Sequence, residues 1–522
     1  MRYRKLGFAG VVAVGALVAI GMTGCRAEDL AGINRDPNNP TSAPPKAVFT
    51  YAMRTAVTRW LGSNFSLRRA EFTAQHLAEV QYPDDDAYRR IGAADTDGDF
   101  IGAYSSELKN FQAVLDAGKA QEQPLLYGPA LVMRSLIFSY ITDVWGDVPY
   151  SEALQGDSPN AVITPKYDTQ KDIYDSLFVA LASATTDMAA APANALALAS
   201  ADPVYSGNGT KWRKFSNSIR ARLAMRLANA DATKGKSELQ AALAAPGGLI
   251  SSNAENARFP WPGDGIYDNP WAANFRTRDD HRMSNTLMNE MLPVSDPRVS
   301  VYAQPTVANP SVYAGMPIAL TQAGASAYFT ISSRPGAVFY GATVYSCPTC
   351  GARTGTSFGS FIMTYAEVSF ILAEAAERGW TTGSAAAFYE QGIRASMEQW
   401  GVTNTAAISA FLANAAIAYK GGTPGLRQIA LQKWIALYTD GVQAWAEWRR
   451  TCIPATLKPG PDAIQSTVPR RYKYSIREGS VNAANLAEAV ARMGADDFNS
   501  RMYWDKNPTA APTYPGATCG QR

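Results

Sequence analysis

Histidine is almost missing from this sequence, which has 2 histidines among 522 residues. Because imidazole is the usual general base and a common metal ligand near neutral pH, this scarcity disfavours histidine-rich metal sites and many hydrolytic mechanisms. The formal net charge of +3 is too small to favour a nucleic acid as a partner. A Gly-x-Ser-x-Gly elbow and a Gly-rich phosphate loop are also lacking. We therefore expect no catalytic residues, no metal, no cofactor and no nucleic acid.

Long uncharged apolar runs are scarce as well, and the clearest covers residues 6–20, behind basic residues at the N-terminus. This run has the length of a signal-peptide core, whereas a spanning helix needs about 20 apolar residues. The residues that follow, Met22-Thr23-Gly24-Cys25, resemble the bacterial lipobox. We expect residues 1–24 to be a lipoprotein signal peptide, with cleavage before a lipid-modified Cys25. An ordinary signal peptide with a chance cysteine is the alternative.

The segment 25–45 is polar and punctuated by prolines, so we expect a flexible, semi-extended tether. The whole chain is 47% hydrophobic and 18% charged, which is an ordinary composition for a globular protein. Residues 46–522 make up most of it. We expect a single folded domain over this range, outside the cytoplasm.

Cysteine is rare, and after Cys25 only Cys347, Cys350, Cys452 and Cys519 remain. An even number in an oxidising compartment suggests disulfides, and four cysteines allow three pairings between which the sequence cannot choose. We favour Cys347 with Cys350 and Cys452 with Cys519. A redox pair and a zinc site are weaker alternatives for the close pair, since no helix start follows it and histidines are few.

Helical periodicity dominates the rest of the chain. Apolar residues recur at helical spacing over 366–378 and 386–400, which predicts an antiparallel hairpin. A second hairpin is expected at 211–245, and another helix over 426–441 is followed by the start of the next. The stretch 129–145 is apolar on nearly all sides, as in a buried central helix. Repeated helix pairs of roughly 30 to 40 residues predict an all-α, tetratricopeptide-like body.

Two regions lack this rhythm, 80–100 and 250–362, and both are rich in Gly, Pro, Asn and aromatic residues. Long irregular stretches in a compact domain are usually functional or disordered. Exposed rings could stack on sugars or bind peptides; alternatively, they pin the loops to the helical body. The loop aromatics of the second region are Trp261, Tyr267, Trp271, Phe275, Tyr340 and Tyr345.

Three charged motifs in the sequence have plain structural interpretations. The spacing of DTDGD at 95–99 does not match a calcium loop, so a polar turn is favoured. Three adjacent aspartates at 84–86 do not supply the two opposed carboxylates of a glycosidase. The basic residues over 211–226 are best explained as a solvated or carboxylate-paired helix face.

Five ordered motifs resemble the SusD/RagB family of outer-membrane nutrient-binding lipoproteins. Along the chain they are NRDPNNPT at 34–41, ITDVWGDVPYSEAL at 141–154, SDPR at 295–298, ILAEAAERGW at 371–380, and the segment from 468 to 490 with MYWDKN at 502–507.

The resemblance implies a mainly all-α, SusD-like fold with about four tetratricopeptide-like helix pairs and a large loop-rich binding region. It implies a non-catalytic protein that captures an oligosaccharide, or alternatively a peptide, at the cell surface. A SusC-like TonB-dependent transporter would be its partner in the outer membrane. A surface hydrolase and a purely structural partner of the transporter are the competing hypotheses. The family has no fixed ligand motif, so we select candidates from the two irregular regions: Tyr82, Tyr88, Arg89, Trp261, Trp271 and Tyr340.

Overall fold

The computed structural model describes most of the chain. The described residues are 43–157, 159–340, 355–505 and 519. The expected signal peptide, Cys25, nearly all of the tether and the pair Cys347 and Cys350 lie outside these residues.

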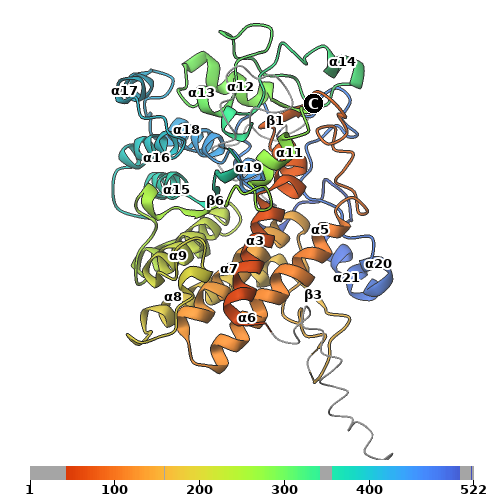
Figure 1. The fold of residues 1–522 in the computed structure, drawn as a ribbon, viewed down its shortest axis with the longest axis vertical. Coiled ribbons are helices and arrows are strands. Elements are labelled where there is room, and N and C mark those ends of the chain that lie inside the picture. Colours follow the sequence, from red (N-terminus) through yellow and green to blue (C-terminus); the bar gives the residue numbers. More distant parts are fainter. Residues whose placement is uncertain (1–42, 158, 341–354, 506–518, 520–522) are drawn as a thin grey trace, which may run out of the picture.

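Helices form the lower part of the molecule in the view of Figure 1. Consecutive helices pack side by side here, each against the next, from α6 through α10. The hairpin expected at 211–245 is confirmed as α9 and α10. The helices of this part are α3 (Pro45–Trp60), α5 (Asp97–Gly102), α6 (Lys109–Ala120), α7 (Pro124–Trp145), α8 (Gln170–Ala189), α9 (Gly209–Arg226) and α10 (Ala232–Ala244).

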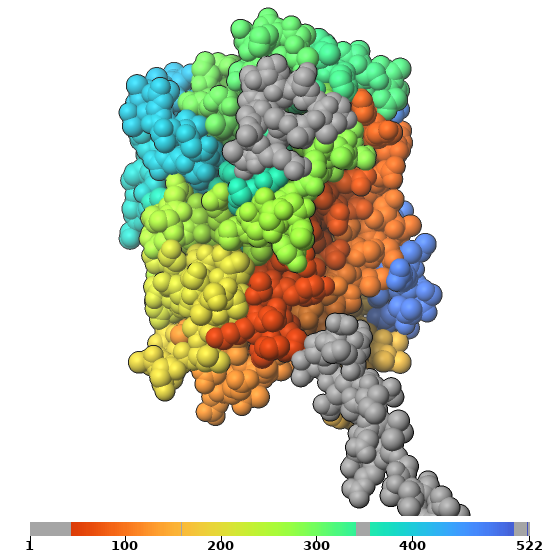
Figure 2. Space-filling view, in the orientation of Figure 1, coloured from red at the N-terminus to blue at the C-terminus, as the bar shows by residue number. Residues whose placement is uncertain are grey.

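A second group of helices packs against the first through α15, which contacts α9. The hairpin predicted at 366–400 is confirmed as α15 and α16, and α18 packs on both of them and on α19. The helices of this part are α15 (Tyr365–Glu377), α16 (Ala385–Gln399), α17 (Thr405–Ala413), α18 (Gly422–Ala436) and α19 (Gly441–Thr451). Helices α20 (Glu478–Val481) and α21 (Ala483–Met493) lie apart from this group, at the right-hand edge of Figure 1 and Figure 2, where α21 contacts β3 (Tyr167–Asp168). The all-α prediction is therefore confirmed.

Short elements build the loop-rich region, much of which lies at the top of Figure 1. Its helices are α11 (Pro270–Phe275), α12 (Asn285–Met291), α13 (Val299–Tyr302) and α14 (Gln322–Ser326). Two antiparallel strand pairs tie distant segments together here: β1 (Leu77–Glu79) with β5 (His281–Met283), and β4 (Ala257–Phe259) with β6 (Ser360–Met363). A third antiparallel pair, β2 (Val148–Pro149) with β3 (Tyr167–Asp168), closes the connection that follows α7.

Helix α7 is the central helix that the sequence predicts. It begins earlier than expected, at Pro124, because proline lacks an N–H that the first turn would leave unpaired anyway. Its length and composition would suit a membrane span, but 83% of its most apolar window is buried inside the protein. We therefore assign it to the core.

Carboxylates pair with the basic run on α9, as the sequence analysis favours. Lys214 contacts Glu255 at 2.6 Å and Arg220 contacts Glu238 at 2.5 Å. Deeper in the protein, Arg222 Nε donates to Glu367 of α15 at 2.7 Å.

A buried ionic cluster joins α15, α18 and α19. Both terminal nitrogens of Arg450 donate to the two oxygens of Glu374, at 2.7 and 2.6 Å. Lys433 donates to Glu447 at 3.0 Å, and Arg450 also pairs with Glu447. Burial alone would raise the pKa of Glu374, but the cations of Arg450, Arg378 and Lys433 together outweigh it and hold this pKa far below its usual range.

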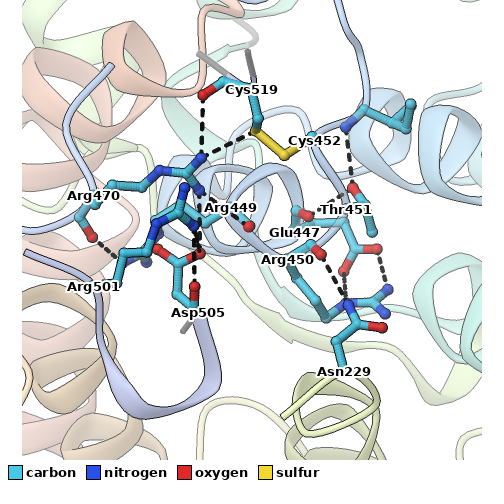
Figure 3. The surroundings of a disulfide bond; sticks show 11 residues. Asn229, Glu447, Arg449, Arg450, Thr451, Cys452, Arg470, Arg501, Asp505 and Cys519 are labelled. Atoms are coloured by element: carbon cyan, nitrogen blue, oxygen red, sulfur yellow. Dashed lines mark hydrogen bonds and ion pairs between the residues drawn. A yellow bond between two sulfur atoms is a disulfide. The ribbon is translucent and has the colours of Figure 1, made fainter. Parts of the chain in front are cut away.

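Next to this cluster, Cys452 and Cys519 form a disulfide, which is the pairing favoured above (Figure 3). Arg470 donates to the carbonyl of Cys519 at 3.3 Å and to Asp505 at 3.2 Å. The bond spans a sequence separation of 67 residues. Closing a loop of this length in the unfolded chain is worth about 4 kcal/mol in the chain-entropy model.

We expect Glu374→Gln to lower the free energy of unfolding by about 3 kcal/mol, because the buried cations of Arg450 and Lys433 then share the single carboxylate of Glu447. Urea unfolding followed by circular dichroism measures this loss. Lys171→Ala is the matched control, since it removes a solvent-exposed ion pair with Asp175 and should cost less than about 1 kcal/mol. Equal losses in both variants would contradict the role assigned to the cluster.

Candidate functional site

The two irregular regions meet where β1 pairs with β5. Glu79 lies opposite His281 in this ladder, and the N–H of Val80 donates to the carbonyl of Asp280 at 2.7 Å. Beyond the strand, the N–H of Tyr82 donates to the side chain of Gln322 at 2.9 Å. Segments about 200 residues apart in the chain therefore share one surface.

Buried carboxylates hold the chain that follows β1. Asp86 accepts the N–H of Glu79 at 2.9 Å, and Glu79 accepts the N–H of Asp85 at 3.2 Å. Tyr82 and Tyr88 have φ angles of 55° and 62°, in the left-handed region that costs non-glycine residues energy. The surrounding bonds thus fix a backbone conformation that this sequence would otherwise populate little.

The same burial shifts the protonation of these groups. Full burial raises the pKa of Asp86 to about 7, although the N–H of Glu79 opposes the shift. Burial, together with the Asp85 carboxylate, raises the pKa of Glu79 well above its usual value. Burial also lowers the pKa of His281 to about 3, helped by the cation of Arg68.

Arginines lie above acids on this surface. The guanidiniums of Arg68 and Arg90 are 3.4 and 3.3 Å from Asp85, and their side chains are 45% and 49% exposed while that of Asp85 is 4% exposed. Arg278 is paired in the same way with the buried Asp280, at 2.7 Å.

The ring of Tyr82 completes the surface. It is 63% exposed, and the guanidinium carbon of Arg278 lies 5.7 Å from its centre. We call Tyr82, Arg68, Arg90 and Arg278 the arginine face. Beside it is a polar hollow of about 450 Å³, lined by Arg59, Asn64, Arg68, Arg69, Asp85, Arg90, Asp95, Gly98 and Asp99.

This arrangement can recognise a ligand rich in hydroxyl groups. Guanidinium N–H groups donate to oxygen acceptors in a fixed plane, and an exposed phenol ring offers a flat apolar surface. The acids beneath hold the guanidiniums in place, so little side-chain entropy is lost when a ligand binds.

Of the candidates from the first irregular region, two lie at the surface. Tyr82 belongs to the arginine face, and Arg89 is partly exposed and pairs with Asp462 at 3.0 Å. Tyr88 is fully buried, and its hydroxyl accepts a hydrogen bond from Gln75 at 3.0 Å. A ligand-contacting role for Tyr88 is therefore wrong in this structure, because its ring is part of the core.

The three candidates from the second region are also buried, which contradicts a stacking role. Trp261 donates to Ser360 at 2.9 Å, and Trp271 donates to the carbonyl of Leu61 at 3.1 Å. Tyr340 stacks on Phe275 with ring centres 4.5 Å apart. These rings pin the loops to the helical body, which was the alternative interpretation.

Of the other loop aromatics, Tyr267 is partly exposed, with the guanidinium of Arg54 over its ring at 5.1 Å. Tyr345 lies outside the described residues.

The acidic motif at 95–99 is bound to arginines. Asp99 pairs with Arg59 at 3.1 Å and with Arg69 at 2.5 Å. Asp97 is 2.9 Å from Arg477. Within the described ranges, no group of three or more His, Cys, Asp or Glu side chains is arranged to hold a metal ion.

The arginines of the face were missed by sequence reasoning. Arg90 lies within the first irregular region and Arg68 lies shortly before it, so their place in the sequence was a usable signal. Arg278 lies about 200 residues away and reaches the face only because β5 pairs with β1.

Comparison with known proteins gives one family and many related structures. A family model described as starch-binding and associating with the outer membrane matches residues 37–475. None of the curated proteins matches the sequence. Among solved structures, a chitin-binding protein shares 25% identity and a TM-score of 0.74, covering 89% of this chain and 100% of its own.

Two further structures have named sources. A SusD homologue from Bacteroides uniformis has 26% identity and a TM-score of 0.74, covering 88% of this chain and 99% of its own. A chitin-binding SusD homologue from Flavobacterium johnsoniae has 23% identity and a TM-score of 0.75, with 90% of this chain and 100% of its own covered. At 23% identity the last likeness describes the fold alone.

We expect stability to fall as pH rises because of Asp86. The carboxyl has a pKa of about 7 when folded and near 3.9 when unfolded, so between these values only the folded state keeps the proton. The contribution is present below pH 4 and is lost as pH rises through 7, which removes roughly 2 to 3 kcal/mol between pH 5 and pH 8.

Asp86→Asn should reduce this dependence, since the amide oxygen still accepts the N–H of Glu79 and carries no charge. Glu79 and Asp440, whose pKa values burial also raises, would cause the slope that remains. Urea unfolding at pH 5 and pH 8 measures the slope. Asp84→Asn is the control, because it leaves Asp86 in place and should keep the wild-type dependence. An unchanged slope in Asp86→Asn would show that other groups cause it.

Proposed function

Because this chain belongs to the SusD-like family, we propose that it captures oligosaccharides without catalysis and delivers them to a TonB-dependent outer-membrane transporter. The motif resemblance noted in the sequence is confirmed by the match over residues 37–475. The observation that carries the proposal is the arginine face, where an exposed ring lies among guanidiniums held on a fixed segment.

The face suits a sugar for chemical reasons. The apolar side of a pyranose can stack on Tyr82, while its hydroxyls accept hydrogen bonds from Arg68, Arg90 and Arg278. The related structure at 25% identity is a chitin-binding protein, which supports a glycan as the ligand class. Peptides are the alternative ligand, since guanidiniums also bind carboxylates.

The anchor completes the proposed mechanism. Lipid on Cys25 would hold the protein at the outer membrane, on its outer face, and the segment 25–45 would let the body move beside its SusC-like partner. Tethering of this kind raises the effective concentration of the binder at the pore mouth. The family description, which includes association with the outer membrane, supports this location.

We expect Tyr82→Ala to weaken glycan binding roughly tenfold, because a stacked ring typically contributes on the order of 1 kcal/mol or more. Calorimetry with chitooligosaccharides, maltooligosaccharides and a peptide panel measures binding by the mature chain. Tyr82→Phe should bind nearly as well as wild type, since the ring is kept.

Tyr51→Ala is a matched control for this experiment. Tyr51 is also an exposed tyrosine with an arginine, Arg54, over its ring at 5.5 Å, but it lies on α3. Unchanged affinity in Tyr82→Ala would show that the glycan does not bind at Tyr82. Binding confined to peptides would replace the glycan in this proposal.

A further inference from the structure

The motif at 141–154 forms part of two hollows that the proposed capture site does not use. Its first residues form the end of α7, and later ones form β2. The chain then makes a long connection that ends at β3. Asp168 of β3 fixes the start of this connection by accepting the N–H groups of Tyr150 and Ser151, at 3.1 and 2.7 Å.

One hollow is apolar, with a volume of about 540 Å³. Its rim carries Ile163, which is 80% exposed, and Val481, which is also largely exposed. Such exposure of aliphatic side chains around a concave surface is typical of a binding site for an apolar group. Its main apolar lining is Phe100, Tyr104, Pro149, Leu154, Ile163 and Val481.

The second hollow is polar and of similar volume, about 530 Å³, with Gln112, Arg134 and Ser151 in its lining. The two hollows share a wall that includes Lys109 and Asp157. These two side chains form an ion pair at 2.5 Å, and Asp157 is 72% exposed. The pair therefore separates the hollows but is open to solvent.

Arg134 distinguishes the polar hollow. Its guanidinium carbon lies over the rings of Phe138 and Tyr150, at 4.9 and 5.5 Å. It makes no ion pair with a carboxylate in the part of the chain that the structure describes, and its Nε is buried without a hydrogen-bond partner. Arg134 lines the hollow as a cation, so an anionic oxygen bound there would be stabilised by its guanidinium.

We propose that the two hollows together bind an amphiphilic carboxylate, a molecule with an apolar chain or ring and one anionic group. The apolar body occupies the hollow beside Ile163, and the carboxylate lies between Arg134 and Lys109. Asp157 gives up Lys109 to the ligand and turns into solvent. This site is independent of the arginine face and of the function proposed for it.

The experiment is calorimetry of decanoate with the full mature chain, beside 1-decanol and butyrate. Decanoate should bind roughly tenfold more tightly than either, since each of these lacks one half of the recognised structure. Equal affinity for decanoate and 1-decanol overturns the role of the cations. If decanoate does not bind, the proposed site is wrong. Phosphatidylglycerol vesicles are measured as well, and binding to the vesicles alone would show that this surface contacts a membrane instead.

Two variants should move decanoate affinity in opposite directions. Arg134→Gln should weaken binding roughly tenfold, and Asp157→Asn should strengthen it several-fold because Lys109 is no longer neutralised. Asp157 is exposed, so this variant tests the proposal even if Arg134→Gln does not fold. Weaker or unchanged binding in Asp157→Asn contradicts it.

Arg258→Gln is the matched control for Arg134→Gln. Arg258 likewise lies over two rings, those of Phe358 and Phe361, at 5.0 and 5.5 Å. It belongs to β4, however, and lines neither of the two hollows. It should leave decanoate affinity at the wild-type value. Glycan binding should be unchanged in all three variants, so failure here and failure of the capture site are distinguishable.

Discussion

The pairing of buried carboxylates on α15 with arginines from two other helices is the constraint on which the scaffold depends. Glu367 accepts hydrogen bonds from Arg222 of α9, and Glu374 accepts hydrogen bonds from Arg450 of α19. The two acids are seven residues apart, or about 10 Å along the helix. A buried charge that loses its partner is strongly destabilising, so any slip of α15 against either neighbour is penalised at two points. The helix thus fixes the two halves of the body relative to each other.

A scaffold fixed in this way can support irregular loops. The strand pair β1 and β5 joins segments from the two irregular regions, and buried Trp261 and Trp271 tie the longer region to the core. The left-handed backbone at Tyr82 persists because its surroundings are over-determined. Recognition by this protein therefore depends on loops that are irregular in form and yet held firmly.

The sequence predicted α7, the hairpins α9–α10 and α15–α16, and α18 with the start of α19, because the burial of one face at helical spacing is a local property. It predicted no range for α3, α6 or α8. Tyr82 and Arg89, which were named as ligand-binding candidates, lie at the surface. The same choice of candidates failed for Tyr88, Trp261, Trp271 and Tyr340, since an aromatic residue among glycines and prolines can as easily anchor a loop as recognise a ligand. Which of the two occurs depends on contacts from distant segments, such as the carbonyl of Leu61 that accepts from Trp271. The contribution of Arg278 to the face depended on a strand pair of three residues, too short to be read from periodicity.

Because its guanidiniums lie over carboxylates, the arginine face has an electrostatic potential of short range. Arg68 and Arg90 share the buried Asp85, and Arg278 lies over Asp280. The exposed Asp84 also contacts Arg90 at 3.4 Å, so three acids offset three cations and the surface has little net charge. At physiological ionic strength fields are screened beyond about 8 Å, and a dipole layer decays faster still. Passing polyanions are consequently not drawn to the face from a distance, and selection operates only on contact. Encounter with the face is then set by diffusion and tether geometry, and it is insensitive to the salinity of the surroundings.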